Sequence, residues 1–371
     1  MSEHGGILAI DVGAGTQDIL LYEEGKPMEN CVQLILPSPT VVLARRVMRV
    51  TRAAEPLFLT GNLMGGGPLV WAVRAHVSAG LPVYATPLAA LTLDDDLEQV
   101  EQMGVRLVEA PPEGATPLAL CDVDLPTLSV ALAPYGVELP QAVAVAVQDH
   151  GHSPCSSNRA FRFAHWQRFV EAGGEIRDLV YLEPPSYLTR MQAVRRDAPG
   201  AYVMDTGAAA IWGALCDEAV AEHRDEGLVV LNVGNAHTVA VLLRGSRVYG
   251  LFEHHTGTLT TKRLKDLVAR LQAGRITNEE VFAEGGHGAY VEPGFEPGEG
   301  FGFVAVTGPN RRLAAGLGYH YAVPYGDMML AGCFGLVAAV QAHSALAETE
   351  RRRPAPPSLG WALRGSNPRT S

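Results

Sequence analysis

The residues near the start of the chain that are best suited to chemistry are an aspartate, two glycines and a threonine. Asp11 ends an apolar run, Gly13 and Gly15 follow it, and Thr16 begins a second apolar run. Glycines let a ligand approach the backbone closely, and the amides of such a turn can face an anion. The pattern predicts a hairpin with a carboxylate at the end of its first strand. It suits Mg²⁺ and phosphate, although glycine turns also join ordinary hairpins.

The chain repeats this pattern in its second half. An apolar run, a glycine-containing turn and a second apolar run follow one another over residues 228–243, with Asn232 in the place of Asp11. Later in each copy comes a strand-like segment that ends in Thr-Gly, at 60–61 and at 307–308. A repeat about as long as a domain indicates that a domain has been duplicated.

Two further apolar runs end in polar side chains. The run over 142–147 predicts a buried strand, and Asp149 and His150 follow it after Gln148. Ligands gather at the carboxyl ends of strands in open α/β sheets, so this pair is a candidate for acid/base chemistry or metal binding. A loop with surface histidines is the alternative. Asp205 ends another apolar run and precedes a helix of small residues. Arg159 and Arg162 are candidates to hold an anionic substrate.

Two loops have more than one interpretation. Gly65, Gly66 and Gly67 come between a predicted strand and a predicted helix, where their amides could bind an anion or where they could form a flexible turn. The run of three aspartates over 94–96 is expected to be a solvated helix start.

Five motifs in this order, between residues 7 and 340, resemble the actin-like ATPase superfamily, which contains actin, Hsp70 chaperones, sugar kinases and acetate kinase. They are the first phosphate loop at 11–16, the first connecting motif at 205–211, the second phosphate loop at 232–238, the adenosine motif at 306–310 and the last connecting helix at 332–339. More narrowly, the chain resembles the prokaryotic DUF1786 family, which is sometimes labelled as related to pyruvate formate-lyase activating enzyme.

The resemblance implies an α/β fold with two duplicated ribonuclease H-like domains and a cleft between them. Two domains also fit the length of 371 residues. The first domain is expected over 1–205, with a substrate-side segment inserted at about 91–140, and the second over 206–348. Residues 349–371, which turn to arginine and proline, are expected to form a disordered tail.

The same resemblance predicts how the two domains superpose. Each is expected to open with three antiparallel strands. Asp11 should then align with Asn232, and Gly61 with Gly308.

The resemblance also implies ATP and Mg²⁺ as cofactors, bound between the domains. Asp11 would hold the metal, and Asp205 would orient the attacking water or acceptor hydroxyl. Asp149 and His150 would act on the acceptor side. The residues implied around the nucleotide are Asp11, Gly13, Gly15, Thr16, Asn232, Gly234, Asn235, His237, Thr238, Thr307, Gly308, Asn310 and Arg311.

Three residues depart from the superfamily pattern. Asn232 stands where an aspartate is usual and supplies no negative charge, and His237 stands where a glycine is usual. Pro309 replaces a second glycine and has no amide to donate. These departures favour nucleotide binding over rapid turnover, and they also leave open a different phosphorylated or carboxylated ligand.

Two classes of function follow. The first is an ATP-dependent phosphotransferase or hydrolase that acts on an unidentified small metabolite, which the dense polar cluster around His150 favours. The second is a non-catalytic nucleotide-dependent switch that acts on a protein partner, which Asn232 favours. Either class of function is compatible with a homo-oligomer.

Composition narrows the remaining partners. The formal net charge of −11 argues against nucleic acid, and the absence of an uncharged apolar run of about 18 residues predicts no membrane span. The five cysteines are scattered, with no zinc or iron–sulfur spacing, although an activating enzyme of the labelled kind needs a cysteine-rich cluster loop. Such cysteines are typical of reduced thiols, and the polar start predicts no signal peptide, so a cytoplasmic location is expected.

Overall fold

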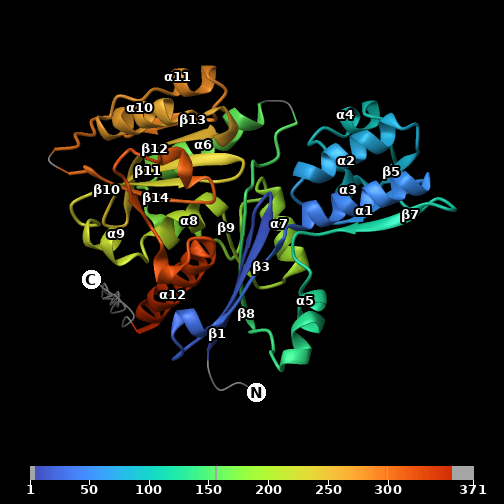
Figure 1. Ribbon diagram of the computed structural model, residues 1–371, viewed down its shortest axis with the longest axis horizontal. Coiled ribbons are helices and arrows are strands. Elements are labelled where there is room, and N and C mark those ends of the chain that lie inside the picture. The colour runs from blue at the N-terminus through green and yellow to red at the C-terminus, as the bar shows by residue number, and fades with distance from the viewer. Residues whose placement is uncertain (1–4, 155–156, 299, 353–371) are drawn as a thin grey trace, which may run out of the picture.

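The computed structural model describes residues 5–154, 157–298 and 300–352 of the chain. Three β-sheets organise it, and Figure 1 shows one of them to the right, set apart from the other two. None of the helices in the described residues combines the length and the apolar character that crossing a membrane needs. The last helix continues to Arg352, so the tail predicted from residue 349 is helical over its first four residues, and its remaining residues, 353–371, lie outside the described residues.

The first sheet has the strand order β3-β2-β1-β8-β9, in which β1, β2 and β3 are antiparallel and β8 and β9 run parallel to β1. Its strands are β1 (Gly6–Val12), β2 (Thr16–Glu23), β3 (Val32–Pro37), β8 (Ala142–Val147) and β9 (Tyr202–Met204). The three opening strands are those that the sequence predicts.

The second sheet repeats this arrangement in the order β13-β12-β11-β10-β14-β15. Strands β10, β11 and β12 are antiparallel, and β14 runs parallel to β10. Its strands are β10 (Leu228–Val233), β11 (His237–Arg244), β12 (Arg247–His255), β13 (Gly288–Val291), β14 (Phe303–Thr307) and β15 (His320–Tyr321). The strand order confirms the duplicated fold that the sequence predicts.

Asp11 and Asn232 occupy the same place in the two sheets. Each is the last residue but one of the central strand, β1 or β10. Side chains alternate between the faces of a strand, so Asp11 shares a face with Ile7 and Ala9. These two residues belong to a core that the first and second sheets share, and Val230, on the same face as Asn232, belongs to it as well. The alternation therefore directs both polar side chains toward the space between the sheets.

The predicted match between Gly61 and Gly308 is wrong. Strand β4 (Leu57–Gly61) lies in the third sheet, whose order is β6-β5-β4-β7, and the first-sheet counterpart of β14 is β8. Both glycines have positive φ, but Gly61 packs against Leu120 whereas Gly308 packs against Val233. The Thr-Gly pair marks a close backbone approach at a strand end and does not say which sheet the strand joins.

The third sheet forms a parallel unit with its own hydrophobic core. Its other strands are β5 (Val83–Ala85), β6 (Val105–Leu107) and β7 (Thr116–Leu120). The sheet therefore takes in chain outside the segment of about 91–140 that was expected as an insertion. The division of the whole chain near residue 205 stays a prediction.

Helices separate and cover the sheets. Apolar residues at helical spacing, Leu264, Leu267, Val268 and Leu271, bury one face of α10 against the second sheet. The helices are α1 (Pro39–Ala53), α2 (Gly67–Ser78), α3 (Pro87–Ala90), α4 (Leu97–Gln102), α5 (Leu125–Leu132), α6 (Asn158–Glu171), α7 (Thr189–Asp197), α8 (Thr206–Ala214), α9 (Glu218–Glu222), α10 (Thr261–Gln272), α11 (Asn278–Ala283) and α12 (Ala331–Arg352).

Helices α8 and α12 pack against each other between the first two sheets (Figure 1). Their crossing is close because glycines lie at the contact. A Cβ at Gly213 would collide with the carbonyl of Ala331, and a Cβ at Gly335 would collide with the carbonyl of Ala209. This close contact agrees with the packing role that the sequence predicts for the small residues after Asp205.

Candidate functional site

A cavity of about 460 Å³ lies where the three sheets approach one another. Every sheet contributes a loop to its wall, and the first turns of α8 and α12 complete it. The lining segments include residues 11–14, 63–67, 91–95, 148–151, 205–207, 234–237, 307–309 and 328–332.

Most of the residues that the sequence predicts for the site line this cavity. They are Asp11, Gly13, Thr16, Asp149, His150, Asp205, Asn232, Gly234, Asn235, His237, Thr307 and Gly308. The other four predicted residues are not among those that line the cavity. Gly15 approaches the Asn235 side chain, and Thr238 is buried beside Thr256. Asn310 and Arg311 are described below.

The two hairpins close in the same way. The amide of Gly13 donates to the carbonyl of Thr16 over 2.9 Å, and the amide of Gly234 donates to the carbonyl of His237 over the same distance. The tips nearly touch, because a Cβ at Gly15 would lie 3.3 Å from Nδ2 of Asn235. The duplicated turns are therefore brought together at one end of the cavity.

Two carboxylates lie behind the first hairpin. Asp11 on β1 is paired in register with Asp18 on β2, and both are buried. Burial, reinforced by Asp18, raises the pKa of Asp11 to about 8, and burial raises the pKa of Asp18 to about 7. Thr206 Oγ1 donates to Asp11 over 3.1 Å, whereas Oδ1 of Asp18 is buried without a hydrogen-bond partner.

These carboxylates fit a hard divalent cation. Oxygen ligands are those that Mg²⁺ prefers, and a cation beside them would stabilise the ionised forms that burial disfavours. Asp18 is absent from the residues that the sequence predicts for the site. The register of the hairpin could have indicated Asp18, because a turn closed by Gly13 and Thr16 places residue 18 opposite residue 11.

The second hairpin has no such charge. Gly308, with a φ of +97°, comes so close that a Cβ there would lie 2.6 Å from Oδ1 of Asn232. Asn310 donates from Nδ2 to the carbonyl of Gly234 over 3.0 Å. Arg311 stacks over Tyr321 at 5.7 Å, away from the cavity lining.

Asp205 belongs to a buried ionic network. Arg162, from α6, donates to Asp205 over 2.7 Å and to both carboxylate oxygens of Glu253 over 2.9 Å. Trp166 donates to the same Glu253 over 3.2 Å. The guanidinium is thus engaged by two carboxylates inside the protein, so the expectation that Arg162 holds an anionic substrate is not supported. The sequence interpretation missed Glu253, because a lone glutamate in an apolar strand gives no pattern.

The loop after β8 reaches the cavity from the first sheet. The carboxylate of Asp149 accepts hydrogen bonds from the amides of Gly151 over 2.8 Å and Met191 over 2.9 Å, so it holds the loop in place. His150 lines the cavity, as Asp11 does, which agrees with the placement that the sequence predicts. The side chain of His152 is directed elsewhere, with Nδ1 3.7 Å from Asp95.

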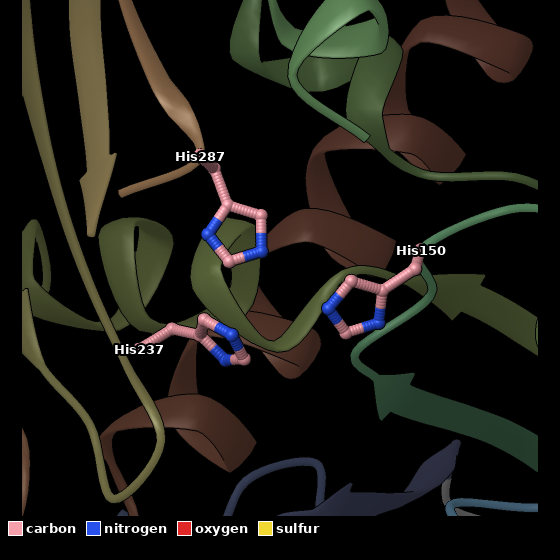
Figure 2. A group of neighbouring side chains, drawn as sticks. All are labelled: His150, His237 and His287. Atoms are coloured by element: carbon pink, nitrogen blue, oxygen red, sulfur yellow. The ribbon is translucent and has the colours of Figure 1, made fainter. Parts of the chain in front are cut away.

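His150 meets two histidines from the second sheet (Figure 2). Its ring centroid lies 5.5 Å from that of His237 and 5.6 Å from that of His287. Burial lowers the pKa of His237 and His287 to about 3 and holds the pKa of His150 well below its usual range. The three rings are therefore neutral near pH 7. His287 stands between two glycines and is not among the residues that the sequence predicts for the site.

The third sheet contributes two loops to the cavity, the one with the three glycines at 65–67 and the one with the three aspartates at 94–96. A Cβ at Gly65 would lie 2.5 Å from Arg190, and a Cβ at Gly66 would lie 2.7 Å from the carbonyl of Thr92, so close packing explains both glycines. Asp96 caps α4, as expected for a helix start. Asp94 and Asp95 instead line the cavity, so the expectation of a fully solvated run is wrong for these two.

No curated protein matches the sequence. Among solved structures, the activator of 2-hydroxyisocaproyl-CoA dehydratase from Clostridium difficile, with bound ADPNP, has 8% identity and a TM-score of 0.34, covering 95% of this chain and 100% of that chain. The ethanolamine utilization protein EutJ from Carboxydothermus hydrogenoformans has 11% identity and a TM-score of 0.31, with 89% and 88% covered. The ROK hexokinase from Thermus thermophilus has 13% identity and a TM-score of 0.31, with 92% and 99% covered.

At such values the assignment of the fold rests on the strand order described above. The sequence comparison is more specific. The family model described as "Putative pyruvate format-lyase activating enzyme (DUF1786)" matches residues 64–313. This match spans more than half of the chain, and the protein belongs to the DUF1786 family.

Proposed function

We propose that the protein binds ATP with Mg²⁺ in the cavity and uses it on a small metabolite, as a phosphotransferase or an ATP-coupled hydrolase. The observation that carries this proposal is the meeting of two equivalent hairpins at one cavity, with the Asp11–Asp18 pair behind one of them. The volume of about 460 Å³ lies within the range of small-molecule sites.

The hairpins would bind the phosphates. Each turn is closed below its tip by a 2.9 Å backbone hydrogen bond, so phosphate oxygens would meet the amides of the tip residues, 14–15 and 235–236. Thr307, Gly308 and Asn310 would lie toward the nucleoside, and Arg311 would reach it only after leaving Tyr321.

Asp11 and Asp18 would hold Mg²⁺, directly or through water. When bound, the ion supplies positive charge that neutralises the phosphates during transfer. Gly332, at the start of α12, leaves room for the Asp11 carboxylate, because a Cβ there would collide with it. The contact also links this carboxylate to the helix between the sheets.

The acceptor would bind on the side of the cavity formed by His150 and Asp205. His150 would contact the hydroxyl or water molecule of the acceptor and orient it for attack, directly or through a bound ion. Asp205, fixed by Arg162, would orient the acceptor. Asp149 would act indirectly, through the loop that its carboxylate holds.

Calorimetric titration with ATP, ADP and a non-hydrolysable analogue, with and without Mg²⁺, tests the proposal. We expect Mg²⁺-dependent binding that Asp11→Asn weakens at least tenfold. The matched control is Asp178→Asn. The Asp178 side chain is 63% exposed, and Asp178 is not among the residues that line the cavity. If no nucleotide binds folded protein at millimolar concentration, ATP must be removed from the proposal.

A nucleotide-dependent switch is the second candidate. It is favoured by Asn232, which supplies no charge to a metal, and by the close contact of α8 with α12, which joins the cavity to both sheets. ATP consumption against a panel of small hydroxy and carboxylic acids separates the candidates, because a switch would bind ATP without any acceptor-dependent turnover.

The description of the family does not fit the cysteines. Cys31 and Cys333 are buried in the core that the first and second sheets share, and Cys121 and Cys216 are partly buried. Within the described residues, no cysteine belongs to a group that could hold a metal. We therefore derive no chemistry from an iron–sulfur cluster.

A further inference from the structure

Three histidines from separate parts of the chain converge at the wall of the cavity. His150 follows β8 in the first sheet, His237 begins β11 in the second, and His287 precedes β13. One ring nitrogen of each lies within 4.8 Å of the others. Figure 2 shows the three rings pointing toward one another.

The nitrogens that meet there are largely without partners. Nε2 of His237 and both ring nitrogens of His287 are buried and make no hydrogen bond, and His287 is only 1% exposed. Buried polar atoms in folded proteins are nearly always satisfied, so unpaired nitrogens that face one another call for a bound group.

The surroundings fix the rings in place. The side-chain amide of Gln148 lies 2.5 Å from Nδ1 of His237. This contact engages Nδ1 of His237 and leaves Nε2 as the ring nitrogen without a partner, as in metal sites where an outer residue orients the ligand ring. Gly286 and Gly288 flank His287, and a Cβ at either would collide with neighbouring side chains. Close packing therefore holds the backbone on both sides of His287 in place.

The donor set selects the kind of metal. Neutral imidazoles suit Zn²⁺ and neighbouring first-row divalent ions, whereas Mg²⁺ prefers oxygen. Tetrahedral coordination with Zn–N distances of about 2.0–2.1 Å brings ligand nitrogens to roughly 3.3 Å from one another. Side-chain rotation can close the difference from 4.8 Å.

We propose that His150, His237 and His287 bind one divalent transition-metal ion of the Zn²⁺ class, with a further coordination position open to the cavity. The position is open on that side because His150 and His237 line the cavity while His287 stands behind them. Three protein ligands plus an open position are typical of catalytic zinc sites. Water or an oxygen of an anionic metabolite would occupy that position.

The buried ions beside the three histidines are Arg162, whose positive charge opposes a cation, and its carboxylate partners Glu253 and Asp205, whose charges favour one. The carboxylate of Glu253 is fully buried and lies close enough to the His287 ring to affect it electrostatically. The proposal also gives His237 a function at a position where the resemblance predicts glycine. It does not depend on nucleotide binding.

The test uses tag-free, full-length protein, stripped with a chelator and titrated with Zn²⁺ or Co²⁺ without nucleotide. We expect one ion per chain by elemental analysis, visible Co²⁺ absorption of a low-symmetry site, and affinity at least tenfold weaker in His287→Gln and in His150→Gln. His152→Gln is the matched control, because His152 lies two residues from His150 and outside the trio.

Circular dichroism must show that each variant is folded. His150 lies on a loop and is only partly buried, so its variant keeps the test valid if His287→Gln fails to fold. Failure of the folded wild-type protein to bind either ion above trace levels would overturn the proposal. So would equal affinity in His150→Gln, His152→Gln and the wild type, which would mean binding elsewhere on the surface.

Discussion

Asp11 and Asp18 lie directly opposite each other on β1 and β2, and both carboxylates are buried at the edge of the cavity. Two carboxylates this close together and out of water are costly when both are ionised. Their raised pKa values, about 8 for Asp11 and about 7 for Asp18, express that cost. Cation binding would offset this cost, so the pair destabilises the free protein and would stabilise a metal complex.

Asp18→Asn separates these two effects. We expect Mg²⁺-dependent ATP affinity to fall at least tenfold, because a charged ligand of the metal is replaced by a neutral one. The ligand-free variant should melt at the same or a higher temperature than the wild type at pH 8, because a carboxylate that burial disfavours is gone. Calorimetry and thermal melting measure the two. Equal Mg²⁺ dependence in variant and wild type would show that Asp18 does not face the ion.

The contact between α8 and α12 predicts a strong effect of a single methyl group. In Gly335→Ala the new Cβ would collide with the carbonyl of Ala209, so the helices must separate. We expect the free energy of unfolding to fall by about 1–3 kcal/mol, the usual cost of overpacking. Gly257→Ala is the control, since a Cβ there meets nothing within 4 Å. Urea denaturation measures both, and equal midpoints would contradict the close crossing.

The sequence predicted the fold well where local pattern and register are enough. Alternating apolar residues and a glycine turn define each opening hairpin, and they place Asp11 and Asn232 at the same strand position. The pattern could not say which strand lies next to β1. Strand β4 follows β3 in the chain but joins the third sheet, whose core is formed by α1 before it and by residues up to Leu120 after it.

The candidate site shows the same division. Most of the residues predicted in motifs line the cavity, whereas the partners that complete it come from distant elements. Glu253 is recognised as part of the site only through its contact with Arg162 of α6. His287 is recognised only through the pairing of β13 with β12, which brings it to the cavity. Single polar residues inside apolar or glycine-rich segments carry no spacing signal, so tertiary contacts alone reveal them.

His165 predicts sensitivity to acid. Its ring stacks on Tyr187 at 4.4 Å, and burial lowers the pKa of His165 to about 4 from an ordinary value of 6.5. The folded state then binds fewer protons than the unfolded state, so this contribution to stability is present above pH 6.5 and is lost as the pH falls toward 4. We expect His165→Phe, which keeps the stacked ring, to lose less stability than the wild type between pH 7 and pH 4.5. Urea midpoints at the two pH values measure this, and parallel losses would contradict it.

His150 separates the enzyme from the switch. It lines the cavity, and its ring lies next to those of His237 and His287. In the enzyme, His150→Ala should abolish acceptor-dependent ATP consumption and change ATP affinity less than about threefold, because the substitution leaves Asp11, Asp18 and the turn amides untouched. Turnover with the metabolite panel and calorimetry with ATP provide the two readouts. His152→Ala, from the same loop, should keep the wild-type rate. An unchanged rate in His150→Ala would remove this residue from the chemistry. A wild-type protein that binds ATP but consumes none with any acceptor would favour the switch, in which the α8–α12 contact and not the histidine would carry the response.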